Sequence, residues 1–162
     1  MNDSHTLGRW LVDSARRHPG KAAIDDRGVT VTYAELERRS DELAHAFARA
    51  GYGVGDRVVS LSGNSADHVV LFFACAKAGL ALVPLSWRLT PSELGPLVRT
   101  TQPALVVAEE ALARLAREAM EAAAVTGPLV GPGTPGIEAT VPTREPGPGA
   151  AWPPQRRPVD DD

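Results

Sequence analysis

Short apolar segments alternate with longer amphipathic segments along most of the chain. The apolar segments are bounded by turn-forming residues and several are rich in valine and leucine, a pattern typical of β-strands. They are Lys21–Ile24, Val29–Val31, Arg57–Leu61, Ala81–Leu85 and Ala104–Ala108, with a weaker candidate at Pro128–Val130. The intervening segments repeat apolar residues at helical spacing and are Leu7–Arg17, Tyr33–Ala50, Ser65–Ala78, Pro91–Thr100 and Glu109–Ala123.

The order of these elements predicts the fold class. A succession of strand, helix and strand at this spacing is typical of parallel βαβ units, so we expect an α/β fold with a parallel sheet. The first two strands are joined by the turn residues Asp25–Gly28 and should form a small separate hairpin.

Several predicted helices carry recognisable start and stop residues. Thr32 is followed three positions later by Glu35, the spacing of a capping box, and Thr90–Glu93 repeats this pattern with a proline at the first helical position. Gly51 should end the second helix, because glycine adopts the left-handed conformation without a steric penalty. Gly95–Pro96 lies inside the fourth helix, where a proline removes a backbone donor.

The composition changes after residue 126. Residues 127–162 hold 9 of the 14 prolines and 6 of the 15 glycines, which support little regular structure. We therefore divide the chain into an α/β unit at residues 1–126 and an irregular Pro/Gly-rich segment at residues 127–162.

Charge and cysteine content exclude several classes of function. The 17 basic and 20 acidic residues give a net charge of −3, without the positive excess that nucleic-acid binding requires. The single cysteine, Cys75, cannot form an internal disulfide or a thiolate metal cluster. No secretion signal or transmembrane segment is evident, so we expect a cytoplasmic protein. Arginine outnumbers lysine 15 to 2, which we attribute to a GC-rich bacterial genome.

The residues taken alone indicate no active site. A G-x-G-x-x-G match at Gly131–Gly136 opens no helix and contains two prolines, which cannot donate to a phosphate. Asp160–Asp162 is interpreted as solvated, His45 and His68 as helix-surface or helix-start residues, and Cys75 as an inert thiol in a buried helix. The four histidines are too far apart in sequence for a local metal site: His5, His18, His45 and His68.

Four segments nevertheless occur in a familiar order and spacing. They are Thr32-Tyr33-Ala34-Glu35-Leu36, Gly55-Asp56-Arg57-Val58, Asn64-Ser65 and Ala76-Lys77-Ala78-Gly79-Leu80-Ala81-Leu82-Val83-Pro84-Leu85. Together they resemble the N-terminal region of the adenylate-forming (AMP-binding) enzymes: acyl-CoA synthetases, adenylation domains of nonribosomal peptide synthetases, and luciferases. The resemblance covers residues 7–108. It implies the N-terminal subdomain of the acyl-CoA synthetase-like fold, with three layers and a partly parallel sheet flanked by helices.

The residues that follow resemble one branch of that family. The segment Ser86–Leu94 is similar to the N-x-R-L-x-x-x-E-L pattern of fatty-acyl and aryl CoA ligases, with Ser86 at the usual asparagine position. In some aryl-CoA ligases, the arginine that matches Arg88 contacts the phosphate of the CoA nucleotide, which suits a permanently charged guanidinium. The alternative is that Arg88 pairs with an acidic surface residue.

The resemblance implies a bacterial ATP-dependent acyl-CoA ligase. Such an enzyme uses ATP, Mg²⁺ and CoA to convert a carboxylic or fatty acid to acyl-CoA through an acyl-adenylate, releasing AMP and pyrophosphate. The family's Ser/Thr/Gly-rich phosphate-binding loop, its magnesium-binding motif and its catalytic lysine have no counterpart in these 162 residues. We therefore expect the chain alone to be inactive, to contain no catalytic residue or metal ligand, and to bind none of these cofactors tightly.

Two alternatives stay open. The chain can be a non-catalytic binding or scaffold module, or a fragment of a peptide-synthetase adenylation domain that loads a carrier-protein thiol. The segment Trp87–Leu89 argues against the second alternative. The family domain contains a second sheet beyond these residues, so we also expect exposed apolar surface and a homo-oligomer.

Overall fold

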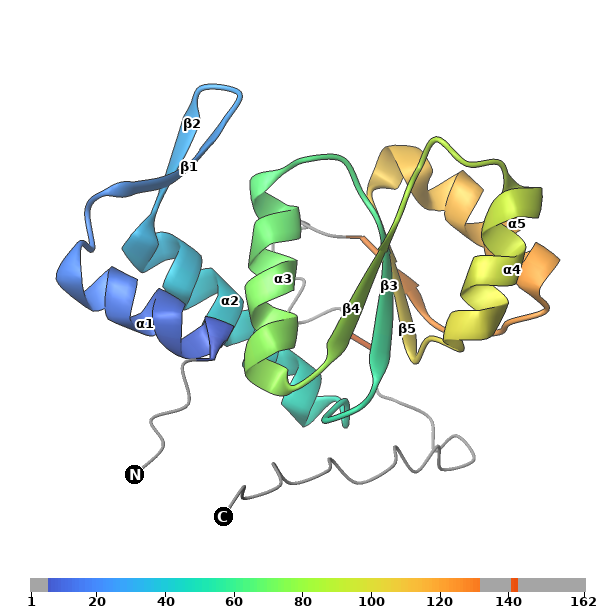
Figure 1. Ribbon diagram of the computed structural model, residues 1–162, viewed down its shortest axis with the longest axis horizontal. Coiled ribbons are helices and arrows are strands. Elements are labelled where there is room, and N and C mark those ends of the chain that lie inside the picture. Colours follow the sequence, from blue (N-terminus) through green and yellow to red (C-terminus); the bar gives the residue numbers. More distant parts are fainter. Residues whose placement is uncertain (1–5, 132–140, 143–162) are drawn as a thin grey trace, which may run out of the picture.

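The computed structural model describes residues 6–131 and 141–142 of the chain. The predicted strands and helices are all present within this part (Figure 1). In chain order the elements are α1 (Leu7–Arg17), β1 (Ala22–Asp26), β2 (Val29–Thr32), α2 (Tyr33–Arg49), β3 (Arg57–Leu61), α3 (Ala66–Ala78), β4 (Ala81–Leu85), α4 (Pro91–Thr101), β5 (Leu105–Ala108), a 3₁₀ helix (Glu110–Leu112), α5 (Ala113–Ala123) and β6 (Leu129–Val130).

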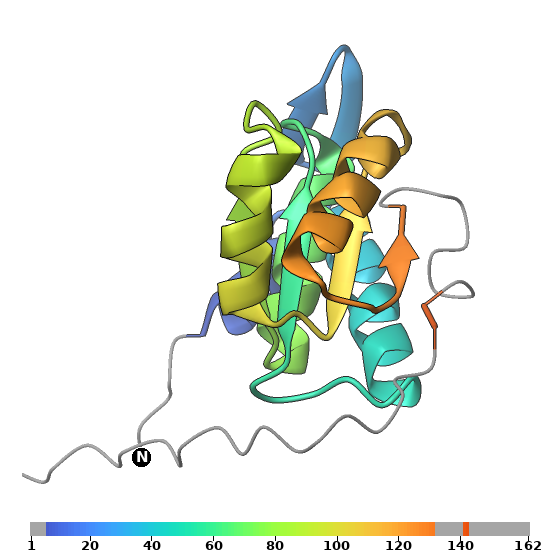
Figure 2. The same ribbon diagram turned by 90° about the vertical axis from the view of Figure 1, so that its right-hand side faces the viewer.

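The main sheet separates two layers of helices. Its strands lie in the order β4-β3-β5-β6, and every neighbouring pair is parallel. Helices α2 and α3 cover one face, with α1 packed on their outer side, while α4 and α5 cover the other face (Figures 1 and 2). The predicted three-layer α/β fold is therefore confirmed, and the weak candidate near residue 129 is the fourth strand.

Alternation along β3 and β5 builds one apolar core on each face of the sheet. Val58 on β3 packs into the cluster formed with α1, α2 and α3, whereas the next residue, Val59, packs against α4 and α5. On β5, Leu105 and Val107 lie in the first cluster and Val106 in the second. Successive side chains of a strand point to opposite faces of the sheet. A central strand that is covered by helices on both faces therefore has apolar residues at nearly every position.

Helix α2 buries the side on which Leu36, Ser40, Leu43 and Phe47 recur at helical spacing. Leu36, Leu43 and Phe47 are each no more than 2% exposed, and Ser40 is fully buried among them. The Ser40 hydroxyl donates to the carbonyl of Glu37 at 3.0 Å, so this buried polar group is satisfied within its own helix.

A part-buried ion pair links α3 to α2. The side chain of Lys77 is 10% exposed, and its Nζ lies 2.9 Å from Oε2 of Glu37 and 3.6 Å from Oδ1 of Asp41. Its hydrogen bond is directed to the backbone carbonyl of Glu37, at 3.2 Å. A Cβ at Gly8 on α1 would lie only 3.1 Å from Cγ of Lys77, so glycine permits the close approach that covers the lysine stem.

The hairpin forms a separate two-stranded antiparallel sheet that projects beyond α1 and α2 (Figure 1). Its turn residues Arg27 and Gly28 have φ angles of 54° and 85°, as a tight hairpin turn requires. Oδ1 of Asp25 accepts a hydrogen bond from the backbone N–H of Gly28 at 2.9 Å and closes the turn.

The helix ends largely follow the predicted capping. The Thr32 hydroxyl accepts from the backbone N–H of Glu35 at 3.2 Å, while Thr32 itself pairs with β1 in the hairpin. At the start of α4, the Glu93 carboxylate accepts from the backbone N–H and then the hydroxyl of Thr90, both at 2.8 Å, which lowers the pKa of Glu93. This cap is therefore complete at neutral pH and is lost as the pH falls through that lowered pKa. Gly51, with φ of 90°, follows the last turn of α2 as expected.

Two helices differ in detail from a regular α-helix at the predicted positions. Helix α4 continues through Gly95–Pro96, because glycine has no Cβ to clash with the following proline ring, and Pro96 lies on the exposed side. The last helix begins later than predicted. Glu109 is extended, residues 110–112 form a 3₁₀ helix, and α5 begins only at Ala113.

Candidate functional site

The loops that follow β3, β4 and β5 lie at the carboxyl edge of the parallel sheet. In open α/β sheets this edge is where ligands bind. Asn64 and Ser65 follow β3, Trp87 and Arg88 follow β4, and Glu109 follows β5. These five residues are therefore the first candidates for a functional site.

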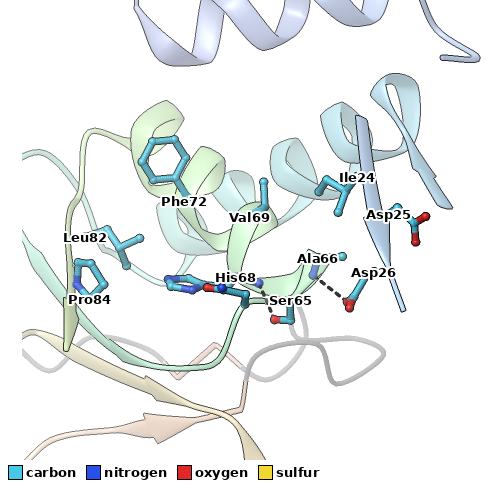
Figure 3. A pocket seen from close by; sticks show the side chains of 11 residues that line it. Ile24, Asp25, Asp26, Ser65, Ala66, His68, Val69, Phe72, Leu82 and Pro84 are labelled. Atoms are coloured by element: carbon cyan, nitrogen blue, oxygen red, sulfur yellow. Dashed lines mark hydrogen bonds between the residues drawn. The ribbon is translucent and has the colours of Figure 1, made fainter. Parts of the chain in front are cut away.

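A pocket of about 410 Å³ opens between the hairpin, α3 and β4 (Figure 3). Val69 and Phe72 on α3 form one wall, and Leu82 and Pro84 on β4 form the facing wall. The complete lining is Ile24, Asp25, Asp26, Asn64, Ser65, Ala66, His68, Val69, Phe72, Leu82 and Pro84. The walls are mostly apolar, and the polar groups gather at the start of α3.

The polar groups at the start of α3 are already bonded to one another. Oδ2 of Asp26 accepts from the backbone N–H of Ala66 at 2.9 Å, so the hairpin caps the helix (Figure 3). The Ser65 hydroxyl accepts from the backbone N–H of His68 at 3.2 Å. Nε2 of His68 lies 3.3 Å from the hydroxyl of the buried Ser60 on β3. His68 is thus a residue of the first helical turn, as predicted, and it also lines the pocket.

Glu109 holds the loop between β3 and α3. Its Oε1 accepts from the Ser62 hydroxyl at 2.5 Å, the Gly63 backbone N–H at 3.1 Å and the Ser65 hydroxyl at 3.4 Å. Its own backbone N–H donates to the carbonyl of Leu61. One carboxylate therefore fixes the loop that carries Asn64 into the pocket lining.

Replacing Glu109 with alanine should lower the free energy of unfolding by about 1–3 kcal/mol, because several part-buried donors lose their acceptor. Glu109→Gln keeps a carbonyl oxygen of the same reach and should recover most of this loss. Urea denaturation of both variants measures the difference, with Glu110→Ala at the exposed neighbouring position as the control. Equal midpoints for Glu109→Ala and Glu110→Ala would show that the carboxylate does not hold the loop.

Arg88 lies in an exposed turn directly after β4. The backbone N–H of Leu89 donates to the carbonyl of Ser86 at 3.2 Å, and the backbone N–H of Arg88 donates to the Ser86 hydroxyl at 3.3 Å. An asparagine side chain can accept in the same way, so serine keeps the turn. The guanidinium of Arg88 lies 4.6 Å from the ring centre of Trp87 and makes no ion pair within the part of the chain that the structure describes.

The other chemical candidates from the sequence are not brought together. Among residues 6–131 and 141–142, no cluster of three histidine, cysteine or acidic side chains could hold a metal ion. His18 and His45 are exposed at separate places, and burial raises the pKa of the Cys75 thiol to about 12, as expected of an inert core cysteine. His5, Gly131–Gly136 beyond its first residue, and Asp160–Asp162 lie outside the described residues. No helix in the described ranges is long and apolar enough to cross a membrane.

Sequence reasoning missed the pocket and the role of Glu109. Each polar residue involved lies at or just beyond the end of a strand: Asp26 ends β1, Ser65 follows β3 and Glu109 follows β5. For Ser65 and Glu109 that position was the available signal, because the carboxyl ends of parallel strands share one edge. Asp26 ends a strand of the antiparallel hairpin, so this signal does not apply to it.

Fold, sheet order and loop placement thus define an α/β unit with its candidate site at the carboxyl edge of the sheet. Comparison with protein-family models gives the same family that the four sequence segments resemble. The chain matches the model of the AMP-binding enzymes over residues 11–162, and it belongs to this family.

Individual relatives are ligases of related chemistry. The chain is 36% identical over 105 residues to a fatty acid–[acyl-carrier-protein] ligase, ScoC, from Streptomyces coeruleorubidus, covering 65% of this chain and 20% of that protein. It is 39% identical over 120 residues to a feruloyl-CoA synthase from an Amycolatopsis species, covering 68% of this chain and 24% of that protein. The crystal structure of a putative long-chain-fatty-acid CoA ligase from Rhodopseudomonas palustris superposes with a TM-score of 0.73 at 27% identity, covering 79% of this chain and 33% of that chain.

The chain therefore spans between a fifth and a quarter of the length of these two curated relatives, and a third of the solved structure. The matched part is an N-terminal α/β unit, as the resemblance implies.

Proposed function

We propose that the chain is the N-terminal part of an ATP-dependent acyl-CoA ligase that activates a carboxylic or fatty acid as an acyl-adenylate. Residues 1–126 would form its first α/β unit, and residues 127–162 would lead toward the phosphate-binding loop. Family membership supports the reaction class. The observation that carries the CoA branch is Arg88, an unpaired guanidinium exposed in the turn at the carboxyl edge of the sheet.

Within this proposal the enzyme uses ATP, Mg²⁺ and CoA. Mg²⁺ would supply charge neutralisation at the phosphates, and the described residues contain no cluster suited to hold it. Arg88 fits the CoA phosphate, since its guanidinium stays charged and can bind two phosphate oxygens at once. Its position over the Trp87 ring, at 4.6 Å, reduces the number of conformations that it must lose on binding.

Transfer to a carrier-protein thiol is the second candidate. The similarity to a ligase named for an acyl-carrier-protein product supports it. A carrier protein presents its thiol without the adenine nucleotide of CoA, so an arginine dedicated to the nucleotide phosphate favours free CoA.

The test titrates the chain with CoA and with dephospho-CoA while the fluorescence of the exposed tryptophans is recorded. We expect weak binding of CoA that falls about fivefold or more when either the phosphate or the Arg88 side chain is removed, the usual effect of losing one exposed charge-assisted contact. Arg49→Ala, which removes an exposed arginine in the last turn of α2, is the matched control. Equal binding of both ligands to the parent chain and to Arg88→Ala would contradict the assignment of Arg88.

The ligase proposal itself is tested by pyrophosphate release and by the reading frame after codon 162. Residues 1–162 alone should release no pyrophosphate above a control without protein. A frame that continues into a strand and a Ser/Thr/Gly-rich loop ending in Pro-Lys-Gly would support the ligase, whereas a stop codon would favour the binding or scaffold module.

Two further expectations from the sequence stay proposals. They are a cytoplasmic location and self-association through exposed apolar residues such as Trp10, which is 50% exposed.

A further inference from the structure

We propose that the pocket between the hairpin, α3 and β4 binds a small uncharged molecule with an aromatic or branched apolar body and one hydrogen-bonding head group. This site is distinct from the proposed CoA contact at Arg88 and does not depend on ligase activity. Its volume, about 410 Å³, lies within the range of pockets that hold small organic ligands.

The walls of the pocket provide apolar contact on opposite sides. Phe72 and Val69 from α3 face Leu82 and Pro84 from β4, and Ile24 closes the side toward the hairpin (Figure 3). Phe72 is 40% exposed although it is a large apolar side chain. A flat or branched apolar molecule between these walls would remove that surface from water, which is the main source of affinity in such sites.

The polar end of the pocket favours an uncharged ligand over an acid. The helix N–H groups of Ala66 and His68 are already bonded to Asp26 and Ser65, so the start of α3 does not offer these two donors to an anion. The Asp25 and Asp26 carboxylates both line the pocket, and in the described part of the chain only Arg27 pairs with Asp26, at 3.5 Å, so this end of the pocket keeps a negative charge that repels an anion. The ring of His68, held by Ser60 through Nε2, is the group placed to bond an amide or hydroxyl head.

The β4 edge of the pocket is a poor template for an added strand. Ala81 donates its backbone N–H to the carbonyl of Asp56 just before β3, so the backbone groups of Ala81, Val83 and Leu85 point toward β3. Leu82 and Pro84 therefore present their backbone groups outward, and proline has no N–H. With a single outward donor on β4, pairing with a strand of a second copy is weak, which favours a compact molecule as the occupant.

Two probes of the same shape and different charge test the proposal. The intact chain is titrated with para-toluamide and with para-toluate while backbone amide NMR signals are followed. We expect the toluamide to shift the signals of Ala66, Val69 and Phe72 in a saturable way, and the toluate to bind at least about fivefold more weakly because of Asp26.

Matched variants locate the binding. Phe72→Ala should weaken toluamide binding about fivefold or more, because the ligand loses an aromatic wall. Leu97→Ala removes an apolar side chain of similar exposure, 42%, from α4 and should leave binding unchanged. Leu82→Ala tests the opposite wall if Phe72→Ala alters the amide spectrum of the free chain.

The proposal would be overturned by an absence of saturable shifts with toluamide, by equal or tighter binding of toluate, or by unchanged binding in both wall variants. NMR shifts at Ala66, Val69 and Phe72 that depend on protein concentration and not on the probe would also overturn the proposal, because they would identify a second copy of the chain as the occupant of the pocket.

Discussion

Phe47→Ala is expected to lower the free energy of unfolding by about 3–5 kcal/mol, the usual cost of removing a buried aromatic side chain. Phe47 on α2 is 1% exposed and packs edge-to-face on Tyr52, with ring centres 6.1 Å apart. The loss combines the transfer free energy of the ring with the cavity that remains between α2 and the sheet. Since domains of this size are stable by about 5–15 kcal/mol, this one change removes a large share of the total.

Urea denaturation followed by circular dichroism measures the change, and Phe72→Ala is the control. Both variants delete the same group, but Phe72 is 40% exposed and its loss should cost far less. Equal losses in the two variants would show that the cluster around α2 does not carry the stability of the fold.

Gly95→Ala is expected to destabilise the chain, although alanine is the better helix former. A Cβ at this position on α4 would lie 2.9 Å from Cβ of Ala122 on α5, and 3.1 Å and 3.2 Å from its backbone carbon and oxygen. Helix propensity favours alanine by about 1 kcal/mol, whereas overpacking costs about 1–3 kcal/mol. We expect the cost of the clash to exceed the gain in helix propensity, because the atoms of Ala122 that are contacted are a Cβ and backbone atoms. Unlike the end of a long side chain, these atoms cannot change rotamer to relieve the contact.

Arg99 on α4 also holds α4 close to α5, because its guanidinium donates to the backbone carbonyls of Ala122 and Ala123 at 2.7 Å and 3.1 Å. Separating α4 from α5 would stretch these bonds and add to the loss. Gly20→Ala is the control, because a Cβ there has no atom within 4 Å, and its melting temperature should stay near that of the parent chain. An unchanged or raised melting temperature for Gly95→Ala would refute the packing argument.

The fold was predictable because its signals are local. The apolar runs at Arg57–Leu61 and Ala104–Ala108 are short and nearly continuous, which indicates strands covered on both faces. The periodicity of α2 placed Leu36 and Phe47 in the core, and the polar turn at Asp25–Gly28 separated the hairpin from the main sheet.

The pocket and the break before α5 were not predictable in this way, because they depend on contacts between distant segments. Glutamate is a residue type common at helix starts, so Glu109 was predicted to begin the last helix. Instead, its carboxylate accepts hydrogen bonds from the Ser62–Ser65 loop, more than 40 residues earlier, and the backbone at Glu109 is extended. Aspartate is a residue type common in turns, but the side chain of Asp26 in the hairpin caps α3, at a residue 40 positions later in the chain. No pattern of neighbouring residues encodes either contact.

The burial of Lys77 makes the chemical reactivity of the chain toward amine reagents unusually selective. The chain has two lysines. The stem of Lys77 is covered by α1 and its ammonium pairs with Glu37 on α2, whereas Lys21 is exposed just before the hairpin. An acetylating enzyme or an amine-directed dye would therefore reach Lys21 while the fold is intact. Acylation of Lys77 requires α3 to separate from α2, so the extent of its labelling over time reports the opening of that helix pair.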